Sequence, residues 1–170
     1  GLRPIREKAK SMGMEFMVWF APERAEPGTE VYVKHPEWMI KPEGMEITGM
    51  YDMGNPDARA YMTDYLKAIT EALALDCIRF DCGAILDRLK MVDAREPDRE
   101  GMAAIRYHKG VYRMWDDLLA AFPDLYIDNC CGGGTRIDLE TCSRSLPLWR
   151  TDGTGWPIMM WSPSDLNEGA

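Results

Sequence analysis

The apolar positions of the chain follow two patterns that alternate along its length. Short runs of mostly apolar residues occupy 14–20, 74–80 and 125–129, and a fourth, less complete run occupies 146–150. Strands of a parallel sheet are buried on both faces and have near-continuous apolar runs of this kind. We therefore predict four strands at these positions.

Between the strands, apolar residues recur at the three- and four-residue spacing of a helix. This spacing predicts helices over 2–12, 56–73 and 101–122, with a shorter one over 137–144. Asn55 and Pro56 stand at the start of the second helix. An Asn side chain caps the first N–H groups of a helix, and proline is well tolerated in its first turn, so this boundary is well defined.

The stretch between the first strand and the second helix is rich in proline and glycine. We expect a helical turn over 31–35 and a hairpin over 38–50 within it. The region 88–99 is charged and irregular, and Gly132–Gly134 is expected to form a loop. Long excursions inside a compact domain are uncommon and are often functional.

The alternation of helices and strands predicts an α/β fold with a parallel sheet and right-handed crossovers. Four βα units are half of a (β/α)₈ TIM barrel, which is typically about 250 residues long. The 170 residues are therefore predicted to form a partial TIM barrel of about four βα units, as one domain over 1–170. A small doubly wound sheet is the alternative, but no G-x-G-x-x-G follows a strand.

Composition and charge exclude several classes of function. A net charge of -8 argues against nucleic-acid binding, which needs a basic patch. The apolar runs are too short to cross a membrane. Five cysteines without regular spacing favour reduced thiols and, slightly, a cytoplasmic location. No C-x-x-C occurs and both histidines lie far from any cysteine, so we expect no metal site.

Two aspartates directly follow predicted strands, Asp81 after the second and Asp152 after the fourth. The carboxyl ends of parallel strands meet at one edge of the sheet, where α/β enzymes carry their active sites. Glycoside hydrolysis uses two carboxylates across such a site, one as nucleophile and one as proton donor. Taken alone, Asp81 is equally well explained as a cap of the following helix.

Arginines and tryptophans accompany both carboxylates in the sequence. Arg79 and Arg150 stand two residues before the aspartates, and alternation along a strand puts each arginine on the face of its aspartate. A neighbouring guanidinium keeps a carboxylate ionised. The side chains of Trp19, Trp149 and Trp156 are available to stack on a sugar ring. The alternative is a pair of ordinary ion pairs at strand ends.

Five short motifs occur in order along nearly the whole chain: W-F-A-P-E (19–23), H-P-E-W (35–38), R-F-D (79–81), N-C-C-G-G-G-T-R (129–136) and W-R-T-D (149–152). They resemble motifs of glycoside hydrolase family 36, the melibiase or α-galactosidase family, which has W-F-E-P-E, K-W-D, C-x-S-G-G-G-R and W-T-S-D. Each motif is modest alone, and together they are specific. By this resemblance the chain is the central part of one catalytic barrel, strands 3 to 6.

The resemblance implies a retaining glycoside hydrolase that removes terminal α-galactosyl residues from oligosaccharides and needs no metal or other cofactor. Asp81 would be the nucleophile and Asp152 the acid/base. The residues expected to bind substrate are Trp19 as a wall of the sugar subsite, Arg79 in place of the family's lysine, Cys130 and Gly133 against the ring, and Trp149 and Arg150. Arg136 is expected to support the loop.

The chain departs from the family's motifs at several positions. Ala21 and Phe80 replace a Glu and a Trp, and Cys82–Gly83 and Gly153–Gly155 replace the residues after the two aspartates. These departures leave the sugar open. The alternatives are an α-N-acetylgalactosaminidase, an α-galactosyl transferase, a non-catalytic sugar-binding relative, and a purely structural α/β segment.

Part of the family's barrel has no counterpart in these residues. Barrel strands 1, 2, 7 and 8 have no counterpart in the resemblance. In the family, strand 2 carries an acidic pair that recognises the sugar. The expected partner is an α-galactoside oligosaccharide, and an oligomer of the full-length protein is compatible with the sequence. No nucleic-acid or membrane partner is expected.

Overall fold

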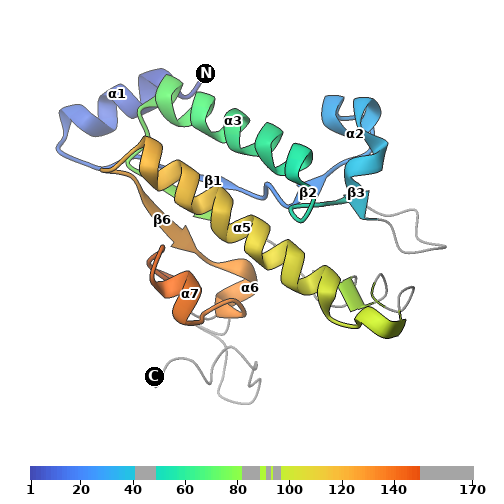
Figure 1. The fold of residues 1–170 in the computed structure, drawn as a ribbon. Coiled ribbons are helices and arrows are strands. Elements are labelled where there is room, and N and C mark those ends of the chain that lie inside the picture. Colours follow the sequence, from blue (N-terminus) through green and yellow to red (C-terminus); the bar gives the residue numbers. More distant parts are fainter. Residues whose placement is uncertain (41–48, 82–88, 91–92, 94–96, 150–170) are drawn as a thin grey trace, which may run out of the picture.

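A computed structural model describes residues 1–40, 49–81, 89–90, 93 and 97–149 (Figure 1). The strands are β1 (Met17–Phe20), β2 (Arg24–Ala25), β3 (Met39–Ile40), β4 (Gly49–Tyr51), β5 (Cys77–Phe80) and β6 (Tyr126–Asn129). The helices are α1 (Arg3–Ser11), α2 (Glu30–Lys34), α3 (Pro56–Leu73), α5 (Met102–Ala121), α6 (Cys131–Gly134) and α7 (Leu139–Cys142), with 3₁₀ turns η1 (Pro36–Trp38) and η2 (Pro97–Arg99).

The main sheet consists of three parallel strands in the order β1-β5-β6. Met17 pairs with Cys77, and Cys77 pairs with Tyr126, so the strands begin and end at the same level. α3 lies between β1 and β5 along the chain, and α5 lies between β5 and β6. This is the α/β arrangement that the sequence predicts.

The strands are shorter than their apolar runs. β1 and β5 each begin three residues later than predicted. For β5 the reason is Ala74, which ends α3 in a left-handed conformation with φ of 44° and so delays the strand. The fourth predicted strand, 146–150, is reduced in its described part to a single parallel bridge between Leu146 and Asp128.

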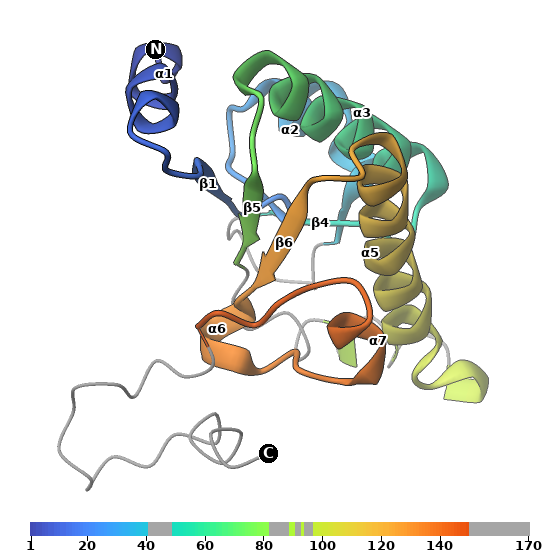
Figure 2. The same cartoon turned by 90° about the vertical axis from the view of Figure 1, so that its left-hand side faces the viewer.

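α3 and α5 pack side by side over the main sheet (Figures 1 and 2). The largest fully buried side chains come mostly from these helices and from β5 and β6, and they include Trp115, Tyr107, Phe80, Leu66 and Ile127. The rings of Phe80 and Trp115 stack with their centroids 5.7 Å apart. α1 buries none of its residues and lies apart from this core, near β1. The core therefore fixes β5 and β6 most firmly.

α3 begins where the sequence predicts. The side chain of Asn55 accepts hydrogen bonds from the backbone N–H groups of Asp57 at 2.9 Å and Ala58 at 3.3 Å. Pro56 occupies the first turn. The first N–H groups of a helix have no partner inside it. The Asn55 side chain accepts two of them and Pro56 has no N–H, which explains the sharp boundary.

α5 passes very close to the turn that joins β4 to α3. A Cβ atom on Gly110 would lie 1.8 Å from the backbone oxygen of Met53. Met53 is itself fully buried. Only a residue without a side chain permits this approach, so Gly110 sets the distance between α5 and the turn.

The excursion after β1 folds into a small antiparallel sheet with the order β2-β4-β3. Ile40 pairs with Met50, which confirms the predicted hairpin, although its residues 41–48 lie outside the described part of the chain. α2 confirms the predicted helical turn. β2 was not predicted, because two residues carry no periodic pattern. The Tyr51 hydroxyl donates to the carbonyl of Ala58 at 2.7 Å and ties this sheet to α3.

The segment after β6 turns through left-handed backbone conformations. Within α6, Gly132 and Gly133 have φ values of 63° and 68°, which glycine adopts at little steric cost. The segment is therefore a tight loop with one helical turn, close to the predicted loop. α7 is shorter than predicted and begins at a capping box formed by Asp138 and Thr141.

Candidate active site

Asp81 lies at the carboxyl end of β5, as the sequence predicts. Its backbone N–H donates to the carbonyl of Phe20 at 3.0 Å, and the N–H of Cys130 donates to the carbonyl of Phe80 at 3.0 Å. These two bonds bring the ends of β1, β5 and β6 to one edge of the sheet. Parallel α/β barrels carry their catalytic residues at this edge.

The Asp81 carboxylate accepts hydrogen bonds from two separate segments. Trp19 on β1 donates its indole N–H to Oδ2 at 3.3 Å. Gly132, in the loop after β6, donates its backbone N–H to Oδ1 at 3.0 Å. Trp19 is 60% exposed, so its ring is open to stack against a ligand. The two donors hold the carboxylate in one orientation at an accessible surface.

Arg79 forms its ion pair with Asp128 and not with Asp81, although the charge of Asp81 also acts on the guanidinium. Its Nη1 forms an ion pair of 2.6 Å with Oδ2 of Asp128 on the neighbouring strand β6. Its guanidinium carbon lies 5.9 Å from the centre of the Trp149 ring, a cation–π distance. Arg79 therefore joins β5, β6 and the segment that follows α7.

Asp128, which was not predicted as a site residue, is fully buried. In addition to the Arg79 ion pair, its Oδ1 accepts a hydrogen bond from the backbone N–H of Leu148 at 2.9 Å. A buried carboxylate needs such partners because burial removes its hydration. The signal in the sequence was an acid inside an apolar run, but the run does not reveal which neighbouring strand supplies the cation.

Cys130 and Gly133 also lie near Asp81. Cys130 is almost completely buried. Burial raises the pKa of its thiol, whereas the Gly133 backbone N–H lowers it. The charge of Asp81 and a hydrogen bond between the thiol and Asp81 raise the pKa further. The thiol is therefore protonated at neutral pH and is a donor toward Asp81.

The other predicted site residues are placed only in part. Trp149 is 45% exposed and faces the Arg79 guanidinium. Arg150, Asp152 and Trp156 lie outside the described residues. The structure thus brings together Asp81, Trp19, Cys130 and the glycine loop, whereas Arg79 is directed to a structural ion pair.

Next to this group lies a buried ion pair between Glu23 and Arg136. Arg136 donates from Nη1 to Oε1 at 2.9 Å and from Nη2 to Oε2 at 2.8 Å, so the pair is bidentate. The Tyr107 hydroxyl also donates to Glu23 Oε2. Glu23 and Arg136 are 1% and 7% exposed. Arg136 is expected to support the loop, and its partner Glu23 was not predicted from the sequence.

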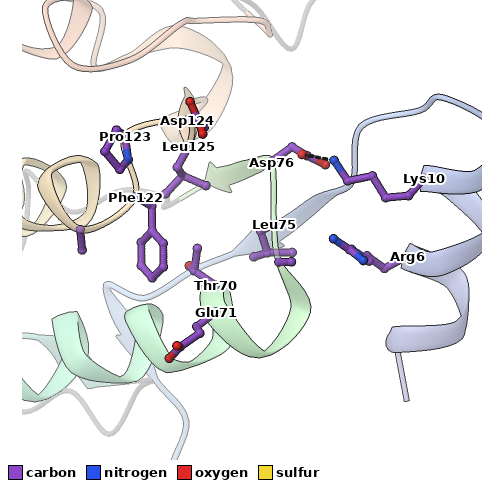
Figure 3. A pocket seen from close by; sticks show the side chains of 12 residues that line it. Arg6, Lys10, Thr70, Glu71, Leu75, Asp76, Phe122, Pro123, Asp124 and Leu125 are labelled. Atoms are coloured by element: carbon purple, nitrogen blue, oxygen red, sulfur yellow. Dashed lines mark hydrogen bonds and ion pairs between the residues drawn. The ribbon is translucent and has the colours of Figure 1, made fainter.

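A pocket of about 380 Å³ lies at the opposite end of the sheet (Figure 3). Leu75 and Asp76 line it just before β5, and Leu125 lines it just before β6. Lys10 of α1 reaches into it and forms an ion pair with Asp76. Because the amino ends of the strands form this pocket, it is not the candidate active site.

Among the described residues, no group of three or more His, Cys, Asp or Glu side chains is arranged to hold a metal ion. No helix within the described ranges has the length and hydropathy needed to cross a membrane.

The carboxyl edge of a parallel α/β sheet is where barrel enzymes carry their active sites, and here it bears a carboxylate, an exposed indole and a glycine-rich loop. The family model described as Melibiase matches residues 1–157. The chain belongs to this family, and the resemblance seen in the sequence motifs is confirmed.

The most similar curated relatives include α-galactosidases from bacteria. The α-galactosidase of Escherichia coli is 29% identical over 157 residues, which are 89% of this chain and 21% of that protein. Alpha-galactosidase AgaA of Geobacillus stearothermophilus is 26% identical over 160 residues, 91% of this chain and 22% of that protein. The chain spans about a fifth of the length of these relatives.

Solved structures show the same fold. One of them is the GH36 α-galactosidase AgaA variant A355E from Geobacillus stearothermophilus in complex with 1-deoxygalactonojirimycin. Its TM-score is 0.78 at 24% identity, and the match covers 91% of this chain and 22% of the AgaA chain. The α-galactosidase from Lactobacillus brevis has a TM-score of 0.73 at 25% identity, covering 91% of this chain and 21% of its own. The described elements therefore adopt the fold of part of a GH36 α-galactosidase.

Proposed function

We propose that the polypeptide carrying this chain is a retaining glycosidase that removes terminal α-galactosyl residues from oligosaccharides. Residues 1–170 would supply strands 3 to 6 of a single catalytic barrel. One observation carries the proposal: in a chain of the Melibiase family, Asp81 stands at the carboxyl end of a parallel strand with two fixed donors on its carboxylate. AgaA structures in complex with stachyose and with raffinose support oligosaccharides of this kind as substrates.

In the first step, Asp81 attacks the anomeric carbon from the face opposite the leaving group, and Asp152 protonates the departing oxygen. The sugar is then bonded to Asp81 in the β configuration. In the second step Asp152 removes a proton from water, which displaces Asp81 and releases the sugar with its original α configuration. The hydrogen bonds from Trp19 and Gly132 keep the carboxylate aligned for attack.

The exposed Trp19 ring would form one wall of the sugar subsite. Cys130 and Gly133 would lie against the ring of the sugar, and Trp149 and Arg150 would also contact the substrate. Arg79 uses one N–H for Asp128, so its contact with a sugar hydroxyl would come from the donors that remain on the guanidinium. No step requires a metal or cofactor.

The stereochemistry of the first product tests this proposal. The protein tested is a longer polypeptide that contains residues 1–170 and supplies the rest of the proposed barrel. It is incubated with an aryl α-galactoside, and the anomeric proton signals are followed by NMR from the first minutes. Release of α-galactose, followed by slow mutarotation, is the expected result. Release of β-galactose would show inversion, and no turnover of any α-galactoside would contradict the proposed activity.

A further inference from the structure

Two of the hydrogen-bond donors of Asp81 come from segments that are far apart in the sequence. Trp19 belongs to β1, and Gly132 belongs to the loop after β6. β1 and β6 do not pair with each other, because β5 lies between them. Pairing with β5 places Trp19 and the start of the loop, so a connection beyond the main sheet is needed to fix the far end of the loop that carries Gly132.

The Glu23–Arg136 ion pair is such a connection. Glu23 follows β1 only a few residues after Trp19, and its backbone carbonyl accepts the N–H of Tyr51 at 3.0 Å. Its side chain receives both terminal nitrogens of Arg136. The pair thus links the extension of β1 directly to the end of the glycine loop.

Arg136 is anchored as firmly on its own side. Its backbone carbonyl accepts the Nδ2–H of Asn129 at 2.8 Å and the hydroxyl of Thr141 at 2.8 Å. Asn129 is the last residue of β6, so this bond closes the loop from its first to its last residue. Figure 2 shows β6 leading directly into this loop.

The loop needs this anchoring because ordering a run of glycines costs conformational entropy. Gly132, Gly133 and Gly134 all have positive φ, and so does Cys131 with 45°. Glycine has more conformational freedom to lose than any other residue. Without a fixed end, the loop would hold the Gly132 N–H against Asp81 for only part of the time.

We propose that Glu23 and Arg136 are positioning residues for the nucleophile. Their buried ion pair holds the Trp19 indole and the Gly132 N–H at the distance that keeps the Asp81 carboxylate aligned for attack. The inference rests on the proposed role of Asp81. Neither residue touches the reacting atoms, so both act through the loop and through β1.

The test compares Glu23→Gln and Arg136→Lys with the wild type in the longer polypeptide, at a temperature well below unfolding. Misalignment of a reacting group by about 1 Å costs on the order of 100-fold in rate. We expect kcat for an aryl α-galactoside to fall by about 10- to 100-fold while KM changes by less than about threefold. Arg136→Lys keeps the charge but loses the bidentate geometry, so it should retain more activity than Arg136→Met.

The matched control is Asp76→Asn at the opposite end of the sheet. Asp76 pairs with Lys10 and accepts the backbone N–H of Phe16 at 2.7 Å, so it also ties distant segments together. Its loss should lower the melting temperature while kcat and KM stay within about twofold of the wild type.

A second variant, Glu23→Leu with Arg136→Met and Tyr107→Phe, separates folding from positioning. Apolar replacement of a buried ion pair often preserves stability, so this variant should fold yet remain slow.

Each outcome decides the proposal. Reduced kcat in the Glu23 and Arg136 variants, with a normal kcat in Asp76→Asn, supports it. A wild-type kcat in Glu23→Gln, or in the folded triple variant, overturns it. A wild-type protein without turnover overturns the proposed function instead, and this inference with it.

Discussion

At the scale of single residues, the donors that the described part of the chain directs at the Asp81 carboxylate are neutral. The indole of Trp19 and the N–H of Gly132 contact its two oxygens, while Arg79 turns to Asp128. These hydrogen bonds orient the carboxylate, while the Arg79 guanidinium acts on it through its charge. A direct ion pair with Arg79 would instead compete with the sugar for the same oxygens.

The sequence predicted the position of Asp81 but not its partners. A strand-end acid is visible as the point where an apolar run stops. Strand alternation puts Arg79 on the face of Asp81, but it does not choose between that carboxylate and Asp128 on the next strand. That choice depends on the register of β5 against β6, where Arg79 stands directly opposite Asp128. Register is a tertiary property and carries no local signal.

Asp152 is expected to act as acid/base, and its role depends on the leaving group. In the longer polypeptide, Asp152→Ala should spare aryl α-galactosides whose leaving groups need no proton and should strongly slow those with poor leaving groups. The measurement is kcat/KM across a series of aryl leaving groups, with the wild type as reference. An equal loss across the series would remove Asp152 from the acid role.

The buried ion pair between Asp128 and Arg79 should contribute strongly to stability. Asp128→Ala leaves the Arg79 charge and the Leu148 N–H without their partner, which we expect to cost about 3–5 kcal/mol of unfolding free energy. Urea denaturation of the longer polypeptide measures the loss. The control is Asp116→Ala, which breaks a pair with Arg144 at a half-exposed carboxylate and should cost at most about 1 kcal/mol. Similar losses in both variants would contradict this assignment.

At the scale of secondary-structure elements, long periodic segments were predicted well and short ones were not. α3 and α5 carry many turns of helical spacing, and α3 also has a strong N-cap. β2 has only two residues and exists because β4 pairs with it. The predicted strand over 146–150 rested on an incomplete apolar run, and its described part makes only one bridge. Whether such short strands form depends on pairing with strands that are distant in the sequence.

Gly110 provides a test of how α5 is positioned. Alanine normally stabilises a helix interior by about 1 kcal/mol relative to glycine. Here a Cβ would lie 1.8 Å from the Met53 oxygen, so the backbone must shift. Gly110→Ala should therefore destabilise the protein, by about 1–3 kcal/mol. Lys109→Ala, at an exposed position of the same helix, should stay within about 0.5 kcal/mol. Chemical denaturation measures both, and a stabilised Gly110→Ala would refute the close approach.

At the scale of the whole molecule, the described sheet has apolar side chains at both edges. Met17 and Trp19 on β1 are 45% and 60% exposed, and Leu146, Leu148 and Trp149 beyond β6 are 53%, 59% and 45% exposed. A closed barrel requires a matched number of strands, tilt and shear, which three parallel strands cannot provide. We propose that further strands of one barrel cover these edges, and the fifth of the relatives' length that the chain spans supports this.

Residues 1–170 expressed alone should therefore be inactive and poorly soluble. Within the described residues β1 is an outer strand of the sheet with exposed apolar side chains, and an edge of this kind promotes association. Sedimentation, thermal unfolding and aryl α-galactosidase activity measure the outcome. A monodisperse monomer with a sharp unfolding transition and measurable turnover would show that these residues form a complete small domain instead of part of a barrel.

The central claim is that Asp81 is the nucleophile, and chemical rescue tests it most directly. In the longer polypeptide, Asp81→Ala should abolish turnover of an aryl α-galactoside, since no carboxylate then reaches the anomeric carbon. Azide fits the space left by the carboxylate and attacks from the same face, so the rescued product should be β-galactosyl azide. Near-normal turnover without azide, or rescue that yields α-galactosyl azide, would contradict the assignment of Asp81.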